Sequence, residues 1–443
     1  MKMLLYSIPF LVLSAVLSSC NKNPIPPEQQ PQISLSLEDV SCTEAWLKLT
    51  TSNISLPADV ELLKDDIHSE TISLTSADTI LYVDSLLPNK TYNFTSLIHT
   101  PDGAIKNSIP VTTMDTTSHN FTFQTWTFGG QAGSCTLYDV AIINENDIWA
   151  VGEIYLLDTL GQPDPLPFNA AQWNGSSWSI KRIQTNFRGN LVTVPLTGIY
   201  AFSSTDIWLV GSLPIHGDGQ NWVMYDLRTT VDPNLTLAKA WGKITNDMYF
   251  VGSSGSIAHY QNGQWSKIES GTELNINDIY GAYNNGTDEW EILAVAADYG
   301  VNFDKAILKL KNNEVIRLTT TSNSDMEPLL GVWFMPGRQY YVVGSGIYQK
   351  HFMDDIIWKN NFFAITTFAT TSITGNDIND VVAVGAFGDL VHFNGVGWKN
   401  DYTEPLLTNG SYTRVAMKGD LLVAVGGNYT SINSEAIILM GRR

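Results

Sequence analysis

Residues 137–152 read LYDVAIINENDIWAVG: an apolar run, a polar turn and a second apolar run that ends in Val-Gly. The same pattern recurs along the chain, with ends at Gly211, Gly252, Gly344, Gly385 and Gly426, and with a weaker copy that ends at Ala296. Three of the intervals between these ends are 41 residues long. Because each copy has short apolar runs on both sides of a tight turn, we expect each to form two antiparallel strands.

A second half of the repeat follows the Val-Gly end. It is clearest in GSIAHYQNGQWSKIES, residues 255–270, and in GDLVHFNGVGWKNDY, residues 388–402. The Asn-Gly pairs at 174–175, 262–263 and 394–395 are typical of primed turns that join two antiparallel strands. One unit therefore has four strands and the period of a propeller blade. We predict an all-β chain in which residues 121–443 form a seven-bladed β-propeller.

Two sets of residues recur at fixed places in the units. They are the tryptophans Trp178, Trp265 and Trp398 and the aspartates Asp147, Asp206 and Asp247. A residue that recurs from blade to blade serves the blade, so we expect the tryptophans to pack between neighbouring sheets. We expect the aspartates to bond backbone amides of the tight turns.

The last unit is incomplete, because AIILMGRR supplies only its third strand before the chain ends. Residues 121–128, FTFQTWTF, have the alternation of a strand and precede the first copy. We predict that this N-terminal strand completes the last sheet and closes the ring, which removes two free edges. Six or eight blades remain open alternatives, since the copy at Ala296 is weak and the first interval is long.

These units resemble the bacterial propellers of the sialidase-type and photosystem-assembly-factor group. The resemblance rests on the core D-[IV]-[WY]-[AF]-V-G followed by G-x-[IL]-x-H-x-N-G-x-x-W, and it covers residues 121–443. It implies the fold and says little about function, because this scaffold serves binding, assembly and hydrolysis. The Asp-box of sialidases, Ser/Thr-x-Asp-x-Gly-x-Thr-Trp, is absent from the sequence, which argues against sialidase chemistry.

Residues 33–117 contain six or seven short alternating runs without helical periodicity, which predicts a β-sandwich. The step LLPNKTYNF, residues 86–94, resembles the fibronectin type III signature. The resemblance implies that Tyr92 is a tyrosine-corner residue, whose hydroxyl bonds backbone of the preceding turn, and that Trp46 is the core tryptophan. An unrelated sandwich is the alternative.

The N-terminus reads as an export signal, residues 1–20, with an apolar run that is too short to be taken as a spanning helix. Its end, Leu17-Ser18-Ser19-Cys20, resembles the bacterial lipoprotein box, which implies lipid attachment at Cys20; an ordinary secretory signal is the alternative. Residues 21–32 are proline-rich and predict an extended tether. We therefore expect a lipid-anchored protein of the cell envelope, at the outer membrane.

Composition narrows the function further. The net charge of -19 argues against nucleic acid as a partner, because phosphates would be repelled. Apart from Cys20 the chain has two cysteines, Cys42 and Cys135, which we expect to be buried free thiols rather than a disulfide.

Insertions mark the face on which a ligand would bind. We expect the loops at 153–169, 182–195, 212–221, 297–304 and 318–329 to emerge on one face of the propeller, which is typical of a binding surface. The candidate ligand-binding residues on this face are Tyr155, Phe168, Arg188, His216, Trp222 and Tyr299. Aromatic rings with scattered carboxylates suit a protein or a carbohydrate ligand, although loop anchoring is the simpler interpretation of each residue.

No catalytic motif is evident, and we predict no catalytic residue, metal site or cofactor. His259 and His392 share a strand position that Gln172 fills in the first unit, which indicates hydrogen bonding rather than base catalysis. Asp377 and Asp380 lie in a predicted turn, where solvated or capping roles are expected.

The sequence thus predicts a non-catalytic binding or scaffolding lipoprotein that recognises a protein or glycan through the insertion-rich face. A glycan-active hydrolase or lyase with its site in the propeller funnel is the alternative, and a structural part of a membrane complex is a third possibility.

Overall fold

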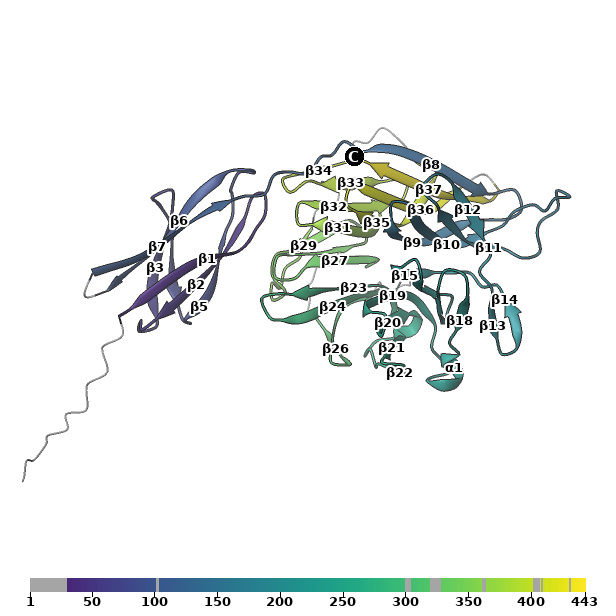
Figure 1. Cartoon of the computed structure of the whole chain (residues 1–443), viewed down its shortest axis with the longest axis horizontal. Helices are drawn as coiled ribbons and strands as arrows, with labels where there is room; N and C mark the ends of the chain where they lie inside the picture. Colours follow the sequence, from purple (N-terminus) through teal and green to yellow (C-terminus); the bar gives the residue numbers. More distant parts are fainter. Residues whose placement is uncertain are drawn as a thin grey trace, which may run out of the picture. The chain divides into compact units, whose positions relative to one another are not determined.

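The computed structural model describes residues 30–100, 103–298, 304–318, 328–360, 364–400, 407, 409–429 and 432–443. These residues form two compact units. The smaller contains Trp46–Tyr82 and Tyr92–Val111 with the first part of β1, and the larger contains Thr112–Arg443 with Asp39–Ala45 and Val83–Thr91. Nearly all regular structure is β (Figure 1).

The smaller unit has two antiparallel sheets. One has the order β1-β2-β5 (Gln32–Val40, Ala45–Ser52, Asp78–Val83), and the other has the order β4-β3-β6-β7 (Ile67–Leu74, Ala58–Lys64, Thr91–Thr100, Gly103–Thr112). Trp46 is fully buried, as expected of a core tryptophan, and its ring centre lies 5.6 Å from that of Tyr82. Tyr92 is also buried, and the hydrogen bond expected of its hydroxyl stays a prediction.

The larger unit has seven four-stranded antiparallel sheets in its described part, which we number as blades 1 to 7. Blade 1 has β9–β12 (Thr136–Asn144, Asp147–Ile154, Phe168–Trp173, Trp178–Lys181). Blade 2 has β15–β18 (Gly198–Ser203, Asp206–Val210, Pro214–Gly217, Trp222–Met224). Blade 3 has β19–β22 (Leu237–Ile244, Asp247–Gly252, Ile257–Gln261, Gln264–Lys267). Blade 4 has β23–β26 (Asn275–Asn284, Glu289–Ala297, Lys305–Lys311, Glu314–Arg317). Blade 5 has β27–β30 (Gly331–Met335, Gln339–Val343, Ile347–Lys350, Lys359–Asn360). Blade 6 has β31–β34 (Thr370–Asp377, Asp380–Gly385, Leu390–Phe393, Trp398–Lys399).

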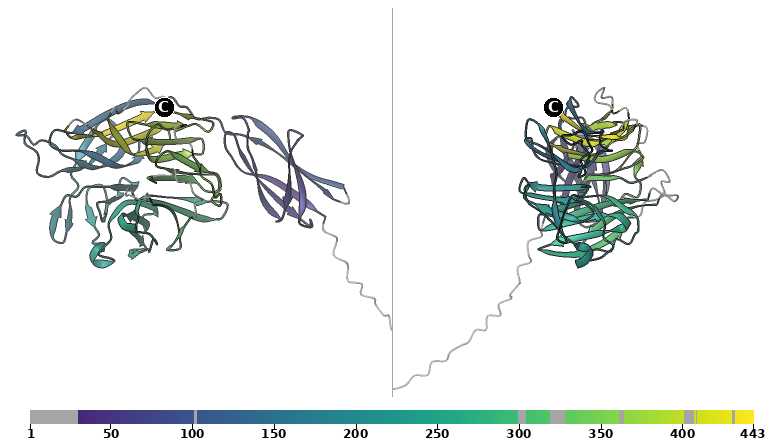
Figure 2. Two further views of the ribbon diagram at one scale, coloured as in Figure 1. Left: turned by 180° about the vertical axis from the view of Figure 1, so that it is seen from behind. Right: turned by 90° about the vertical axis from the view of Figure 1, so that its right-hand side faces the viewer.

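Blade 7 joins the two ends of this unit. Its order is β35-β36-β37-β8 (Gly410–Lys418, Leu421–Tyr429, Ser434–Arg442, Thr122–Gly129), with Trp126 opposite Ile438. In Figure 2 the blue strand β8 lies beside the yellow C-terminal strands. The predicted closure by an N-terminal strand is confirmed. Outside the blades, a hairpin β13–β14 (Thr185–Phe187, Asn190–Val192), a helix α1 (Leu227–Thr230) and a 3-10 turn η1 (Ser253–Gly255) lie in the connections.

The core lies between successive sheets rather than at one centre. In β10, Ile148 and Ala150 pack toward blade 7, whereas Trp149 and Val151 pack toward blade 2. Such strands are buried on both faces, which is why they read as continuous apolar runs. The recurrent tryptophans pack against the preceding blade as predicted: Trp178 against Trp126, Trp265 against Trp208, and Trp398 against Tyr341.

In four of the repeats the glycine at the end of the second strand is required by a close approach of backbone. A Cβ on Gly152 would lie 2.1 Å from the carbonyl oxygen of Thr136, and one on Gly252 would lie 2.1 Å from that of Thr236. These contacts are far below van der Waals separation, so a side chain at either place would push the first two strands apart.

Only one of the three Asn-Gly pairs forms the predicted two-residue turn. Both Asn262 and Gly263 have positive φ, and they directly link β21 to β22. The other two loops have four residues, and the amide oxygen of Asn174 or Asn394 accepts backbone N–H groups within the loop. The prediction of primed turns is therefore wrong at 174–175 and 394–395, because the asparagine side chain stabilises a longer turn.

Candidate functional site

A shared irregularity directs polar side chains into the middle of the ring. In five blades the pairing of the first two strands shifts by one residue near the start of the first strand. Such a bulge leaves one residue unpaired and re-aims the next one. The residues that follow the bulges are Asp139, Lys239, Asp278, Ser372 and Arg414. Four of these five residues are charged, and the four charged side chains form a single network.

Arg414 is the hub of this network. Its Nη1 lies 2.7 Å from Asp278 Oδ1, and its Nε lies 3.4 Å from Asp139 Oδ1. Lys239 Nζ lies 3.0 Å from Asp139 Oδ2. Two cations thus face two buried carboxylates, and the four side chains come from blades 7, 4, 1 and 3.

The carboxylates also bind the next blade along the ring. Asp139 Oδ2 accepts the amide of Ile199 at 3.2 Å, and Asp278 Oδ2 accepts the amide of Val332 at 3.2 Å. Burial lowers the pKa of Lys239, whereas for Arg414 the pairing with Asp278 and Asp139 outweighs burial and raises its pKa above the usual value. By formal charge the two cations balance the two carboxylates, and the network links blades to one another.

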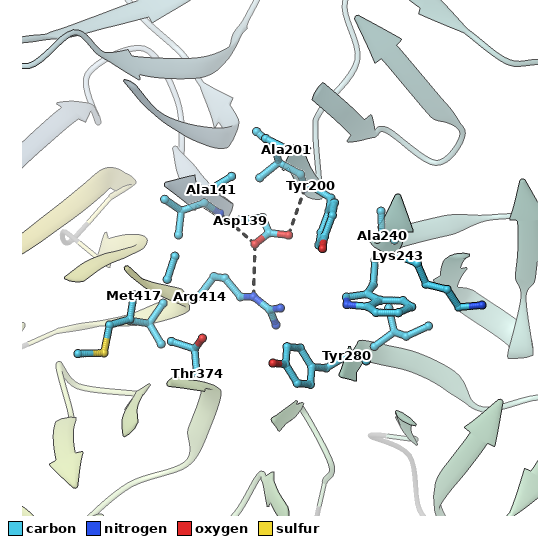
Figure 3. Close-up of a pocket in the computed structure, with 18 of the residues that line it drawn as sticks. Asp139, Ala141, Tyr200, Ala201, Ala240, Lys243, Tyr280, Thr374, Arg414 and Met417 are labelled. Atoms are coloured by element: carbon cyan, nitrogen blue, oxygen red, sulfur yellow. Dashed lines mark hydrogen bonds and ion pairs between the residues drawn. The ribbon is translucent and has the colours of Figure 1, made fainter. Parts of the chain in front are cut away.

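A cavity of about 410 Å³ lies beside this network, toward the end of the ring where first strands turn into second strands (Figure 3). Polar and apolar groups contribute about equally to its surface, and its apolar residues and glycines are Val140, Ala141, Ile199, Ala201, Ala240, Trp241, Gly242, Ile279, Gly281, Trp290, Val415, Ala416 and Met417. Tyr200 and Tyr280 direct their hydroxyls into it. Burial raises the pKa of both tyrosines to about 12, so each hydroxyl stays protonated and can donate a hydrogen bond.

Trp290 lines the cavity, and further exposed apolar side chains stand at the turn ends of the strands that form it; we call the following four residues the aromatic rim: Phe202, Ile244, Tyr283 and Trp290. They come from the turn ends of blades 2, 3 and 4, and Trp290 and Tyr283 are 39% and 41% exposed. The ring centre of Trp290 lies 5.6 Å from those of Trp241 and Tyr283. Exposed aromatic side chains beside a cavity are typical of a binding site.

The chemistry of this site suits binding. Its polar side-chain groups are the two tyrosine hydroxyls, the hydroxyl of Thr374, the indole N–H groups of Trp241 and Trp290, and charged side chains that already have partners in the fold. The carboxylates of Asp139 and Asp278 each form an ion pair with a cationic side chain and each accept a hydrogen bond from a backbone amide. Neither carboxylate is therefore placed to exchange a proton with a ligand.

Two of the predicted ligand-binding residues lie at the connection between the second and third strands of blade 1, and a third lies between blade 1 and blade 2. Tyr155 follows β10 and donates its hydroxyl to Glu153 at 2.9 Å. Phe168 begins β11, with the guanidinium of Arg182 4.1 Å from its ring centre. Arg188 in the β13–β14 hairpin pairs with Asp226 at 2.7 Å. All three anchor loops within the fold, and their role in binding stays a prediction.

The placement of His216 and Trp222 on the same face as these loops is wrong. Residues 212–221 are not one insertion, because Pro214–Gly217 form the third strand of blade 2. His216 is inside that strand, and Trp222 begins the next strand after a tight turn at the opposite end of the blade. Tyr299 and Cys20 lie outside the described residues, as do the signal and most of the tether.

The recurrent aspartates bind side chains of their own blade. Asp206 pairs with His216 at 2.8 Å, and Asp247 pairs with His259 at 2.7 Å. In blade 1 the amide of Gln172 donates to Asp147 at 3.0 Å. The prediction that these aspartates bond turn amides is thus replaced by a side-chain pair between the second and third strands, where a histidine or glutamine faces the aspartate across the sheet.

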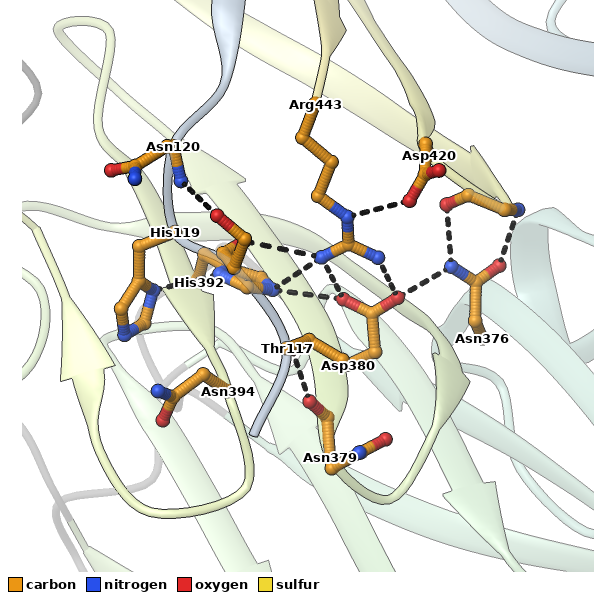
Figure 4. A network of polar contacts seen from close by, with 12 residues as sticks. Thr117, His119, Asn120, Asn376, Asn379, Asp380, His392, Asn394, Asp420 and Arg443 are labelled. Carbon is orange, nitrogen blue, oxygen red and sulfur yellow. Dashed lines mark hydrogen bonds and ion pairs between the residues drawn. The ribbon is translucent and has the colours of Figure 1, made fainter. Parts of the chain in front are cut away.

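Asp380 belongs to a buried network and is not a solvated turn residue (Figure 4). It pairs with His392 at 2.8 Å and with Arg443, and His392 Nδ1 lies 2.8 Å from His119 Nδ1. Burial raises the pKa of Asp380, but the hydrogen bonds from His392 and Arg443 outweigh it and lower the pKa to about 2. Asp377 differs, because burial raises its pKa.

The charged residues in the middle of the ring, which we call the channel residues, were not identified from the sequence. Asp139, Asp278 and Arg414 come from three distant repeats and match no linear motif. A signal was present, since a charged residue stands three or four places after the start of an apolar first strand, where a propeller core should be apolar.

Two buried cysteines, Cys42 and Cys135, are free, as expected. Within the described ranges, no three His, Cys, Asp or Glu side chains gather closely enough to hold a metal ion. Over the same ranges, no helix has the length and apolar character to cross a bilayer.

The seven sheets around a central channel define a β-propeller. No protein-family model matches the chain, and no curated protein matches it. Among solved structures, 29 chains match, including one described as YCF48 bound to D1 peptide. That match has a TM-score of 0.51 at 13% identity and covers 74% of this chain and 99% of the other. YCF48 is a seven-bladed propeller and photosystem II assembly factor, so the expected likeness in fold to that group is confirmed.

Proposed function

We propose that this chain is a non-catalytic binding or scaffolding protein that holds its ligand at the aromatic rim and the adjoining cavity. One observation carries the proposal: exposed Trp290 and Tyr283 border a cavity whose charged neighbours neutralise one another. The exposed rings offer apolar contact, and a ligand would bind without displacing an ion pair.

The proposed setting is the cell envelope. The lipoprotein box at Cys20 and the proline-rich tether support attachment to the outer membrane through a lipid. The strand orders β1-β2-β5 and β4-β3-β6-β7, with the signature at residues 86–94, support a fibronectin type III-like sandwich as a spacer. The solved YCF48 structure is bound to D1 peptide, which supports recognition as a use of this scaffold.

A glycan-active enzyme is less well supported. The carboxylates that reach the channel, Asp139 and Asp278, each accept a cation and a backbone amide. An acid-base pair needs one carboxyl that can hold a proton beside the scissile bond. Tightly paired carboxylates are poor candidates for that role.

Site-specific photo-crosslinking tests the proposal. The full chain, made in the cells that normally produce it, would carry a photoreactive phenylalanine at position 283 or, as a matched control, at 387. Tyr283 lies in the rim, whereas Phe387 is an exposed aromatic in the loop between β32 and β33. We expect an adduct from position 283 alone. Adducts from 387 alone, or from neither position, would overturn the proposed site.

A further inference from the structure

We infer that the ligand of this site is a polypeptide segment that inserts a bulky apolar side chain into the cavity and carries basic residues beside it. The inference rests on the proposed function and names the class of partner.

The lining of the cavity favours a polypeptide over a sugar. Every hydroxyl of a buried sugar needs a hydrogen-bond partner, and each one left without a partner costs about 1–3 kcal/mol. The uncharged side-chain donors in its lining are the hydroxyls of Tyr200, Tyr280 and Thr374 and the indole N–H groups of Trp241 and Trp290, with no asparagine, glutamine or glutamate among the lining residues. Its charged groups are occupied: Lys243 Nζ lies 3.1 Å from Asp247 Oδ2, and Arg414 is held by its two carboxylates. An apolar side chain requires none of these bonds.

The rim favours a polypeptide for a second reason. Ile244 is 60% exposed and Phe202 is 36% exposed, and neither offers a polar atom on its side chain. Such residues gain free energy only by burial against apolar groups. Sites that bind a protein through a few anchors typically present a pocket for one large side chain, surrounded by apolar contacts that exclude water. A cavity of about 410 Å³ beside an apolar rim has this form.

The negative charge of this protein indicates which residues of the bound segment lie next to the apolar side chain that enters the cavity, which we call the anchor. The whole chain carries a net charge of -19. At the rim, the carboxylate of Asp288 accepts a hydrogen bond from the hydroxyl of Tyr283, whereas Glu289, which precedes Trp290, is paired with Lys311 at 2.7 Å. Complementary charge raises the rate of association and disfavours acidic partners. The segment that binds should therefore carry lysine or arginine next to its anchor.

Selection from a random peptide library tests the inference. Phage-displayed dodecapeptides would be selected on the full chain, and synthetic copies of the enriched sequences would be measured by fluorescence anisotropy. We expect an aromatic or large aliphatic residue beside Lys or Arg in these sequences. The affinity should fall about tenfold or more in Trp290→Ala and should weaken with added salt.

The matched control is Phe387→Ala, which removes another exposed aromatic side chain elsewhere on the propeller. This control should leave the affinity unchanged. If Trp290→Ala alters the fold, Tyr283→Ala replaces it as the test variant, and we expect it to weaken binding. The inference is overturned if no peptide is enriched, or if the enriched peptides bind Trp290→Ala and the native chain equally. It is also overturned if an oligosaccharide array yields ligands that depend on Trp290 while peptides do not. In that last case the proposed binding function stands and only the inference about a polypeptide ligand is wrong. If instead no crosslink forms from position 283, both the proposed function and the inference are wrong.

Discussion

Arg414 of blade 7 and Asp278 of blade 4 form an ion pair of 2.7 Å across the middle of the ring. The two blades are not neighbours, so this pair connects parts of the propeller that share no sheet-to-sheet packing. Contacts between adjacent blades are local, as when Thr413 Oγ1 donates to the carbonyl of Leu137 at 2.6 Å. Repeat proteins are generally held by nearest-neighbour contacts, and the Arg414 network adds a link that spans several repeats.

Removing the hub of this network should be costly. Arg414→Met keeps the aliphatic bulk but leaves Asp278 and Asp139 without their shared cation. We expect a loss of about 3–5 kcal/mol in the free energy of unfolding, because a buried charge loses its partner. Urea unfolding followed by tryptophan fluorescence measures it. The control is Arg442→Met, which breaks an exposed pair with Glu145 and should cost about 0–1 kcal/mol. Equal effects of the two substitutions would mean that the central pair adds no stability.

The stability that the aspartate–histidine pairs contribute should come from the hydrogen bond to the aspartate and should not require an imidazole ring. Gln172 donates to Asp147 in blade 1 in the place where His259 meets Asp247 in blade 3. We therefore expect His259→Gln to retain most of the stability of the native chain. His259→Leu leaves the half-buried carboxylate of Asp247 with fewer partners and should cost about 1–3 kcal/mol. Thermal and urea unfolding of both variants check this, and a glutamine variant as unstable as the leucine variant would contradict it.

The sequence predicted local features of the propeller far better than it predicted the site. Val-Gly ends and recurrent tryptophans are set by contacts within a blade or with the next one, so each leaves a pattern in every repeat. The closing strand was predictable because an incomplete last repeat and an extra strand at 121–128 match each other. The channel was not, because Asp139, Asp278 and Arg414 meet only after the ring closes, and each stands once in its own repeat. The placement of His216 was wrong for a different reason. The third strand of blade 2 is short and contains glycine and proline, so its sequence is typical of a loop.

Acid should weaken the network around Asp380 selectively. The pKa of Asp380 is lowered to about 2 in the folded chain, against about 3.9 for an unfolded aspartate. A group with a lowered pKa adds stability above its unfolded pKa and loses that contribution as the pH falls toward its folded value. The difference in unfolding free energy between the native chain and Asp380→Asn should thus be full at pH 5–7 and shrink between pH 4 and pH 2. Urea unfolding across this range measures it, and a difference independent of pH would refute the assignment.

The shape of the cavity should depend on the absence of a side chain at Gly281. A Cβ on Gly281 would lie 2.4 Å from Cζ2 of Trp241, so Gly281→Ala must displace an indole that lines the cavity and contacts Trp290. We expect a cost of about 1–3 kcal/mol from overpacking and a weaker affinity for peptides selected on the native chain. Near-ultraviolet circular dichroism should report the movement of Trp241. Gly397→Ala is the matched control, because no atom lies within 4 Å of its Cβ position. If both alanine variants bind the peptides as the native chain does, Trp241 does not shape the binding site.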